Sequence, residues 1–358
     1  MSATAHFPTK GVRNIRQLSL DELTQYFETL GEPRFRAKQV WEWLWAKQAH
    51  TFADMTNLSK DLRQKLGQHF TLPALTVDAT QYSADGTVKS RFRTHEGHLC
   101  EGVLIPTEER FTACVSSQIG CSLACKFCAT GYIDRKRNID FDEIYDEVVL
   151  LNQQSEKVYN RKLTNIVFMG MGEPLLNYKN VLKAIERITA PDGLAMSPRR
   201  ITVSTAGVAK AIRQLGDDKV KFKLALSLHA PNDAKRNEIM NINASNDLKS
   251  LVEALNYFYQ QTKSEITLEY ILFNDFNDSQ KDAEELVKLY RQIPADLVNI
   301  IEYNPIDFAK YEKPTEQRME EFMGYLAKHR VNARLRRSRG KDIDAACGQL
   351  ANKEGISS

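Results

Sequence analysis

The octapeptide CSLACKFC, residues 121–128, places three of the chain's six cysteines in one short stretch. Cys121, Cys125 and Cys128 have the spacing C-x3-C-x2-C and follow FTACV, an apolar run that predicts a strand. A structural zinc site takes four ligands, commonly as two pairs, so three thiols in one loop leave a position vacant. An iron–sulfur cluster held by three cysteines leaves one iron without a protein ligand. The spacing therefore indicates a cluster whose open iron takes an external chelating molecule.

The composition is that of an ordinary globular protein. The 358 residues are 42% hydrophobic and 27% charged, with a net charge of +3, which suits one large α/β domain and a smaller one. The N-terminal stretch MSATAHFPTKG has no signal-peptide pattern, and no apolar run approaches the roughly 18 residues that span a membrane. We therefore expect a cytoplasmic protein without a membrane partner. In that compartment cysteines are more often metal ligands, catalytic groups or core residues than structural disulfides.

From residue 107 the chain alternates short apolar segments with segments of helix length. Strands are predicted at 111–115, 165–170, 200–205, 222–229, 266–272 and 297–304. Helices are predicted between them, for example at 141–154 and 279–293. Continuous apolar strands that alternate with helices favour a parallel sheet covered by helices, and six such units favour a partial (β/α)6 barrel of the α/β class. A further extended piece, VNARLRRS at 331–338, is expected to close or flank the sheet.

Four regions follow from the changes of pattern along the chain. They are an N-terminal helical accessory domain, a β-hairpin linker, a catalytic core and a flexible tail, at residues 1–75, 76–106, 107–350 and 351–358. Ser19 and Glu22 fit a capping box at the start of the first helix. Trp41 and Trp45 share one helix face, which predicts a small core, with an RNA-stacking surface as the alternative. The hairpin is expected to turn at Glu96-Gly97.

Candidate binding residues lie at the C-terminal ends of several predicted strands, where barrel proteins build their sites. They are Gly172 and Glu173 in FMGMGEP, Ser204 in VSTAG, Ser227, Leu228 and His229 in LSLHA, and Asn304 in EYNP. Taken singly, each is more often a loop or core residue. Their recurrence at successive strand ends indicates a binding site.

The cysteine triplet, in a loop after the first strand of a predicted barrel, resembles the radical S-adenosylmethionine (SAM) superfamily, and Phe127 fits the aromatic residue found there. In that superfamily the open iron of a [4Fe-4S] cluster binds the amino and carboxylate groups of SAM. The resemblance implies that Cys121, Cys125 and Cys128 hold the cluster. It also implies SAM contacts from Gly172, Glu173, Ser204, Ser227, Leu228, His229 and Asn304.

Longer stretches narrow the resemblance to one branch. CVSSQIGCSLACKFCATG, MGMGEPLLNY, SPRRITVSTAGV, LALSLHAP and DIDAACGQL are similar to RNA methyltransferases that act on a ring carbon of adenosine, and the resemblance runs across nearly the whole chain. Within this branch the RlmN family makes 2-methyladenosine, whereas a sister family tied to antibiotic resistance methylates carbon 8. With Pro174 directly after Gly172 and Glu173, the chain resembles the RlmN family. The resemblance implies two substrates, 23S rRNA at the peptidyl transferase centre and certain tRNAs at the adenosine 3′ of the anticodon. It also implies that the N-terminal helical accessory domain, residues 1–75, helps to bind RNA.

Carbon 2 of adenine lies between two ring nitrogens and is too electron-poor to attack the methyl group of SAM. The resemblance implies that Cys347 first takes a methyl group from one SAM, and that a radical made from a second SAM abstracts hydrogen from it. The resulting thiomethylene radical adds to adenine and joins protein and RNA covalently. Glu101 is implied as the proton acceptor. Cys114 is implied as the resolving thiol, which leaves a transient Cys114–Cys347 disulfide.

Further partners and two alternatives complete the expectations. The resemblance implies a flavodoxin-like electron donor, a thiol reductant and a monomer, and basic residues from Arg330 to Lys341 favour phosphate contacts. One alternative keeps the radical chemistry but methylates carbon 8. The other is a non-catalytic, zinc-stabilised RNA-binding protein in which Cys114, or Cys100, joins the triplet as a fourth ligand. That alternative does not explain Cys347.

Overall fold

The structure is a computed structural model that describes residues 13–352. The chain divides into two units. The first takes the residues up to Leu75 together with Lys183–Met196, and the second takes Thr76–Leu182 and the residues from Ser197 onward. Two predicted regions lie wholly or partly outside the described residues. They are the N-terminal stretch MSATAHFPTKG, in which no signal peptide is expected, and residues 353–358 of the tail predicted at 351–358.

The first unit is helical, with α1 (Leu20–Thr29), α2 (Phe35–Trp45) and α3 (Lys60–His69), and its strands β1 (Arg13–Asn14) and β2 (Phe70–Thr71) pair in parallel. The predicted capping box is confirmed. Ser19 Oγ accepts the Glu22 N–H at 3.1 Å, and Glu22 Oε2 accepts the Ser19 N–H at 2.7 Å. Two orphan N–H groups of α1 are thereby satisfied.

The tryptophans of α2 form part of a core, as one of the two sequence interpretations expects. Trp45 is fully buried, and the Trp41 ring packs edge-on against it with 5.8 Å between ring centroids. Trp41 Nε1 also donates to Asp192 Oδ2 at 2.7 Å. Asp192 belongs to the segment Lys183–Met196, whose membership of this unit the sequence did not indicate.

The second unit is built on a ten-stranded sheet in the order β14-β13-β12-β11-β10-β9-β6-β5-β4-β3. The strands are β3 (Thr76–Tyr82), β4 (Val88–Arg93), β5 (Leu99–Pro106), β6 (Phe111–Cys114), β9 (Asn165–Phe168), β10 (Ile201–Thr205), β11 (Lys223–Ser227), β12 (Ile266–Leu272), β13 (Leu297–Glu302) and β14 (Ala333–Arg336). All neighbours from β6 to β14 pair in parallel. The carboxyl ends of these strands therefore meet at one edge.

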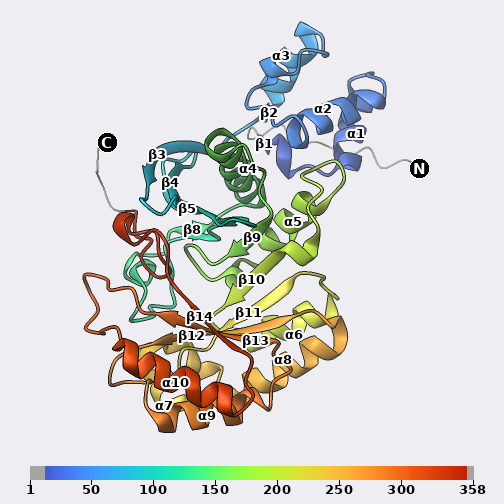
Figure 1. Ribbon diagram of the computed structural model, residues 1–358. Helices are drawn as coiled ribbons and strands as arrows, with labels where there is room; N and C mark the ends of the chain where they lie inside the picture. Colours follow the sequence, from blue (N-terminus) through green and yellow to red (C-terminus); the bar gives the residue numbers. More distant parts are fainter. Residues whose placement is uncertain (1–12, 353–358) are drawn as a thin grey trace. The chain divides into compact units, whose positions relative to one another are not determined.

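The connections between the parallel strands carry the remaining helices. They are α4 (Phe141–Tyr159), α5 (Tyr178–Thr189), α6 (Ala209–Asp217), α7 (Asp233–Ile239), α8 (Leu248–Thr262), α9 (Gln280–Tyr290) and α10 (Glu316–Lys328). In Figure 1 the helices α6, α8, α9 and α10 lie on the outside of the curved sheet. The sheet is open, with β14 and β3 at its edges. The prediction of an α/β partial barrel is confirmed, and VNARLRRS flanks the sheet as β14.

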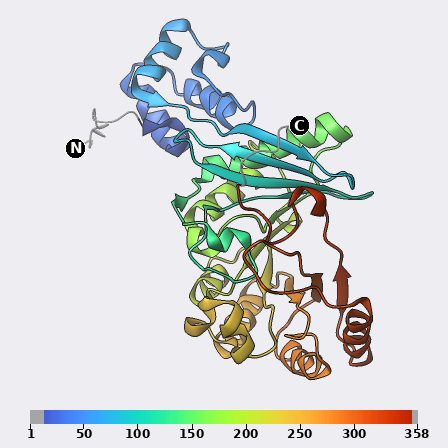
Figure 2. The ribbon, with the colours of Figure 1, turned by 90° about the vertical axis from the view of Figure 1, so that its left-hand side faces the viewer.

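Residues 76–106 differ from the expected hairpin linker. Strands β4 and β5 do pair around the turn at Glu96-Gly97, but β3 adds a third strand and β5 pairs with β6 of the core. These antiparallel strands thus extend the main sheet, as Figure 2 shows in cyan. A short antiparallel pair, β7 (Gln118–Ile119) and β8 (Arg137–Asn138), brackets the cysteine loop. Among residues 13–352, no helix combines the length and apolar character needed to cross a bilayer.

Candidate functional site

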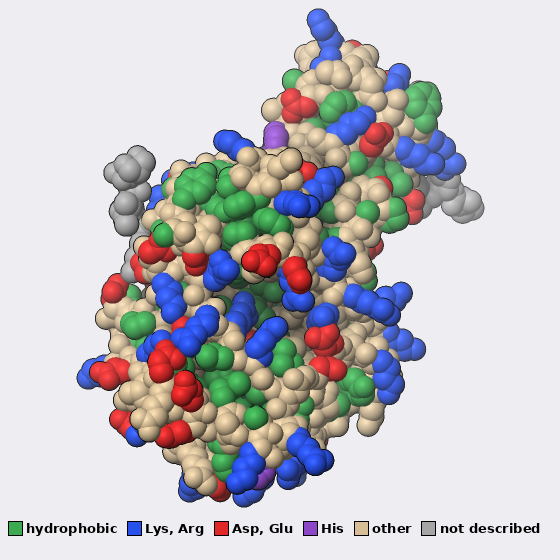
Figure 3. Space-filling view, in the orientation of Figure 1, with side chains coloured by type: hydrophobic (Ala, Val, Ile, Leu, Met, Phe, Trp, Pro, Cys, Tyr) green, Lys and Arg blue, Asp and Glu red, His purple; other side chains and the backbone are tan. Residues whose placement is uncertain are grey.

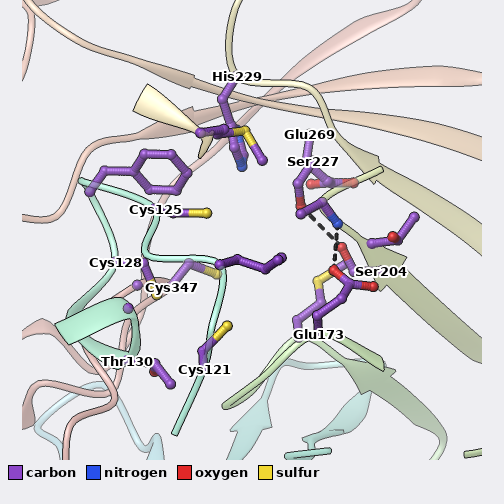
Figure 4. Close-up of a pocket in the computed structure, with 18 of the residues that line it drawn as sticks. Cys121, Cys125, Cys128, Thr130, Glu173, Ser204, Ser227, His229, Glu269 and Cys347 are labelled. Carbon is purple, nitrogen blue, oxygen red and sulfur yellow. Dashed lines mark hydrogen bonds between the residues drawn. The ribbon is translucent and has the colours of Figure 1, made fainter. Parts of the chain in front are cut away.

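A cavity with about 880 Å³ of empty space, part of it open to solvent, lies where the parallel strands end. Cys121, Cys125 and Cys128 all line it. Figure 4 shows these thiols on one side of the cavity and Glu173, Ser204 and Ser227 on the facing side. A wall of thiols opposite a wall of polar groups suits a cluster with a polar ligand between the two.

The cysteine loop is folded tightly around its own backbone. The Cys128 N–H donates to the Cys125 carbonyl at 3.1 Å, and a Cβ on Gly131 would lie 2.9 Å from that same carbonyl oxygen. Only glycine fits there. The Gly131 N–H donates to the Cys128 carbonyl at 2.9 Å. Burial raises the pKa of the Cys128 thiol, and the neighbouring N–H groups of Gly131 and Thr130 oppose that rise.

Burial disfavours the charged form of these thiols. It raises the pKa of Cys121 to about 11, and it raises the pKa of Cys125 further above the ordinary range. Thiolates are the metal-binding form, so they need a cationic partner in this cavity. The irons of a cluster supply that charge. The donor set and its surroundings therefore fit an iron–sulfur cluster.

A single metal ion fits less well. Within residues 13–352, no group of three or more His, Cys, Asp or Glu side chains is placed to hold one ion. A zinc ion needs all of its ligands about 2.0–2.3 Å away, whereas each cysteine of a cluster binds a different iron. Cys114 lines a different cavity from the triplet. The four-thiol zinc alternative thus has no support in this geometry.

Gly172 and Glu173 enter the cavity after β9. Gly172 has a φ of +92°, and a Cβ there would lie 2.4 Å from the Cβ of Gln118, so this position requires glycine. The buried Glu173 carboxylate accepts the Ala206 N–H at 2.7 Å and the Leu175 N–H at 3.0 Å. It thereby ties the end of β9 to the end of β10. Burial raises the pKa of Glu173, and a nearby ligand ammonium would counter this effect.

Three other predicted SAM contacts line the same cavity. Ser204 Oγ and Ser227 Oγ lie 3.3 Å apart, so both hydroxyls face one space. His229 is buried with a φ of +56°, and its Nδ1 accepts the Ile271 N–H at 3.2 Å. Burial, and then the charge of Arg236, lower the pKa of His229 to about 3. The histidine is therefore neutral at physiological pH.

Two predicted contacts do not line the cavity. Leu228 is fully buried, and its N–H donates to the Glu269 carbonyl at 2.9 Å. Asn304 Nδ2 donates to Ser338 Oγ at 2.9 Å and to the Cys347 carbonyl at 3.3 Å. Asn304 thus positions the segment that carries Cys347.

Arg236 of α7 holds the strand ends at the cavity in place, and its side chain is fully buried. Its guanidinium donates to the carbonyls of Ala206, Ser227 and Leu228 and to Asn243 Oδ1. Arg236 is not among the predicted site residues, because nothing in its local sequence pattern distinguishes it from a surface arginine.

We expect Arg236→Met to lower the free energy of unfolding by about 3–5 kcal/mol, since several buried carbonyls lose their donor at once. Urea denaturation measures the loss. Arg213→Met, which removes an exposed ion pair with Glu253, is the matched control and should cost less than about 1 kcal/mol. Equal losses for both variants would contradict a structural role for the buried guanidinium.

Cys347 lines this cavity and also a second, larger one with about 2250 Å³ of empty space. Cys114, at the end of β6, lines the second cavity. Burial raises the pKa of the Cys114 thiol, and the neighbouring Cys347 thiol adds to the effect. The structure therefore brings together the two cysteines that the sequence singled out outside the triplet.

Basic residues surround the second cavity. Figure 3 shows Lys and Arg side chains gathered around a hollow on one face of the molecule. The cavity lining includes Arg110, Lys223, Arg334, Arg336, Arg337 and Arg339. Part of the basic run is neutralised within the protein, because Arg337, in this lining, and Lys341, outside it, pair with Glu302 at 2.6 and 2.7 Å. The positive charge of the basic residues from Arg330 to Lys341 is thus partly neutralised by Glu302.

Glu101, the predicted proton acceptor, lines neither cavity. Its buried Oε2 accepts the N–H groups of Ala351 and Asn352 at 2.9 and 3.1 Å, and Lys89 Nζ lies 3.7 Å from Oε1. In this structure Glu101 therefore holds the segment that follows Cys347. The first two residues of the expected flexible tail are therefore held by hydrogen bonds to Glu101.

The segment before Cys347 is held in a similar way by the turn between β3 and β4. Asp342 accepts from Ser83 Oγ at 2.5 Å and from the Ala84 N–H at 3.0 Å, and Asp85 accepts the Gly340 N–H at 2.9 Å. Figure 2 shows this red segment beside the ends of the cyan strands. The antiparallel extension of the sheet thus sets the position of the Cys347 thiol.

This anchor depends on pH. Burial raises the pKa of Asp85, but hydrogen bonds from Thr87 and Gly340 outweigh it and lower the pKa from 3.8 to about 2. A lowered folded-state pKa contributes stability above the unfolded pKa, and that stability is lost as the pH falls from about 4 to about 2. We expect wild type to resist urea better than Asp85→Asn at pH 6, with the difference shrinking across this window. A constant difference would contradict the assignment.

Comparisons with known proteins agree with this geometry. Residues 13–72 match the family model of the ribosomal RNA large subunit methyltransferase N-terminal domain, and residues 115–289 match that of the radical SAM superfamily. The chain is 54% identical over 340 residues to a probable dual-specificity RNA methyltransferase RlmN from Cytophaga hutchinsonii, which covers 95% of this chain and 93% of that protein.

Two further relatives extend the similarity. The chain is 43% identical to a dual-specificity RNA methyltransferase RlmN from Geotalea uraniireducens, with 95% and 97% of the two chains covered. The fold is similar to the crystal structure of a radical SAM methyltransferase from Sphaerobacter thermophilus, with a TM-score of 0.88, 38% identity, and 94% and 99% of the two chains covered.

Proposed function

Since the chain belongs to the RlmN family of radical SAM methyltransferases, we propose that it methylates carbon 2 of adenosine in RNA. Its substrates are 23S rRNA, at the peptidyl transferase centre, and certain tRNAs, at the adenosine 3′ of the anticodon. The observation that carries the proposal is the position of Cys347, which lines the three-thiol cavity and the cavity of Cys114. A thiol that carries a methyl group between two substrates must reach both of them.

Family membership brings a [4Fe-4S] cluster and SAM as cofactors. Cys121, Cys125 and Cys128 would hold the cluster, which when bound supplies the electron that cleaves SAM to a radical. Glu173 and the hydroxyls of Ser204 and Ser227 face the thiols across the cavity and would orient the polar groups of SAM.

Cys347 performs the transfer in two stages. Its sulfur first takes the methyl group of one SAM, which leaves as S-adenosylhomocysteine. After the radical has removed a hydrogen atom, the methylene carbon on Cys347 bonds to carbon 2 of adenine. The ring adduct then loses the carbon-2 proton to a base and its unpaired electron, which the oxidised cluster would accept. The Cys114 thiolate then attacks the Cys347 sulfur, so that a disulfide forms while the sulfur–carbon bond breaks. The carbon keeps the electron pair and takes a proton. A thiol reductant reopens the disulfide.

Glu101 is proposed as the acceptor of the ring proton, and the structure sets a condition for this role. Its carboxylate is occupied by the N–H groups of Ala351 and Asn352. These groups must release Glu101 before it reaches the base. Docking of RNA beside Cys347 would shift the segment that contains them.

The remaining partners complete the proposal. The basic lining of the second cavity supports contacts to RNA phosphates. The target base must leave its stack to reach the Cys347 thiol, which lines the two cavities. We expect a cytoplasmic monomer that receives electrons from a flavodoxin-like donor.

Mass spectrometry of RNA from cells that lack the protein tests the proposal. We expect 2-methyladenosine to disappear from 23S rRNA and tRNA, and to return when wild-type protein is supplied. Loss of 8-methyladenosine instead would establish the carbon-8 reaction. An unchanged RNA profile would contradict both.

A further inference from the structure

Five residues line both cavities: Met169, Glu269, Ile301, Arg336 and Cys347. Under the proposed function, a base that receives carbon from Cys347 must enter the space that these residues enclose. Two of them are charged, although barrel interiors are usually packed with branched apolar side chains. This departure needs a physical reason.

Only one of the two carboxylate oxygens of the buried Glu269 accepts hydrogen bonds from described residues. Its Oε1 accepts from Thr267 Oγ1 at 2.9 Å and from Asn299 Nδ2 at 2.7 Å. Its Oε2 has no hydrogen-bond partner among the described residues. A buried acceptor without a donor is unfavourable, so this oxygen calls for a ligand that brings an N–H or O–H group.

Arg336 supplies the complementary group. Its Nη1 lies 3.8 Å from Glu269 Oε2, beyond hydrogen-bond distance, and donates weakly to the Met169 sulfur at 3.8 Å. The nearby Cys347 thiol raises the pKa of Arg336, as Glu269 and Cys114 also do. An acceptor and a donor thus lie side by side, with the methyl-carrying thiol close to the donor.

This pattern matches one edge of adenine. The exocyclic amine on carbon 6 donates, the adjacent ring nitrogen N1 accepts, and carbon 2 follows N1 directly. Guanine presents the reverse pattern, with an acceptor at carbon 6 and a donor at N1.

We propose that Glu269 and Arg336 recognise the target adenine of the RNA, with Glu269 Oε2 accepting from the exocyclic amine and Arg336 donating to N1. This inference rests on the proposed function. The arrangement would turn carbon 2 towards Cys347 and reject guanine.

The local hydrogen bonds make Glu269→Gln an informative variant. Thr267 and Asn299 both donate to the Oε1 position, so the glutamine would place its oxygen there. Its NH2 group would then occupy the Oε2 position. An acceptor becomes a donor without a change of shape, and this donor faces the amine of adenine.

The experiment compares wild type with Glu269→Gln on two synthetic anticodon stem-loop RNAs, with adenosine or purine riboside at the target position. Purine riboside keeps N1 and carbon 2 but lacks the amine. We expect wild type to prefer adenosine by about 10- to 100-fold in kcat/KM and in RNA affinity without SAM. Glu269→Gln should lose that preference, while its kcat/KM and its affinity for the purine riboside RNA stay within about threefold of wild type.

Glu265→Gln is the matched control. Glu265 directly precedes β12, which carries Glu269, lines only the second of the two cavities and pairs with Lys223 at 2.5 Å. This variant should keep the wild-type preference for adenosine. A preference that persists in Glu269→Gln would overturn the proposal.

A second measurement separates RNA from SAM, whose adenine has the same edge. Methylation of Cys347 by SAM in the absence of RNA should be unchanged in Glu269→Gln. If it falls, Glu269 serves SAM and the proposal is wrong. If wild type fails to methylate the adenosine RNA at all, the proposed function fails instead.

Discussion

Cys114→Ala protein, purified from growing cells, is expected to carry RNA covalently attached to Cys347. The reaction should reach the stage at which the methylene carbon joins the thiol to adenine. Release needs a second sulfur beside Cys347, and Cys114 lies at the second cavity that Cys347 also lines. Without that thiol the protein–RNA bond should persist.

A denaturing gel with and without ribonuclease measures the adduct, and mass spectrometry of the Cys347 peptide identifies the attached nucleotide. Cys100→Ala is the control, because Cys100 is a buried cysteine of β5 that lines neither cavity. It should be isolated free of RNA. RNA-free Cys114→Ala protein from cells in which the enzyme is active would count against the resolving role.

Cys347→Ala is expected to lower RNA methylation by roughly a thousandfold or more, because the methyl group loses its carrier. The three cluster thiols are untouched, so iron and sulfide content and the brown colour should match wild type. Cleavage of SAM by reductant should also continue.

The matched comparison is Cys125→Ala, which should lose both the colour and the methylation. Together the two variants separate methyl carriage from cluster binding. Turnover by Cys347→Ala near the wild-type rate would show that the methyl group takes another route.

Much of the fold could be predicted because its strands are continuous apolar runs bounded by polar residues. The segment ITLEYIL coincides with β12, and the other core strands differ from their predicted bounds by one to a few residues. The antiparallel strands were harder to place. Their local pattern reveals a hairpin, but pairing of β5 with β6 depends on a surface that only the folded sheet presents.

The candidate site was predictable where residue type and spacing carry the chemistry, as in the cysteine loop. The site was less predictable where the direction of the backbone decides whether a side chain points into the cavity or into the core. Leu228 lies at the end of β11 like its neighbours Ser227 and His229, yet its side chain is directed into the core. Glu269 was overlooked, although a lone carboxylate inside an apolar strand was the available signal. Its role depends on partners from β13 and β14, which sequence spacing does not reveal.

The bond from Ala351 to Glu101 joins residues 250 positions apart, and it has a consequence for biogenesis. A contact of such long range closes a large loop, and the chain entropy that this costs must be offset by contacts formed elsewhere. Under the proposed function, the Cys114 and Cys347 thiols would therefore stay separated until that loop closes. We expect this order to protect a polypeptide that is still acquiring its structure from premature crosslinking of the two thiols.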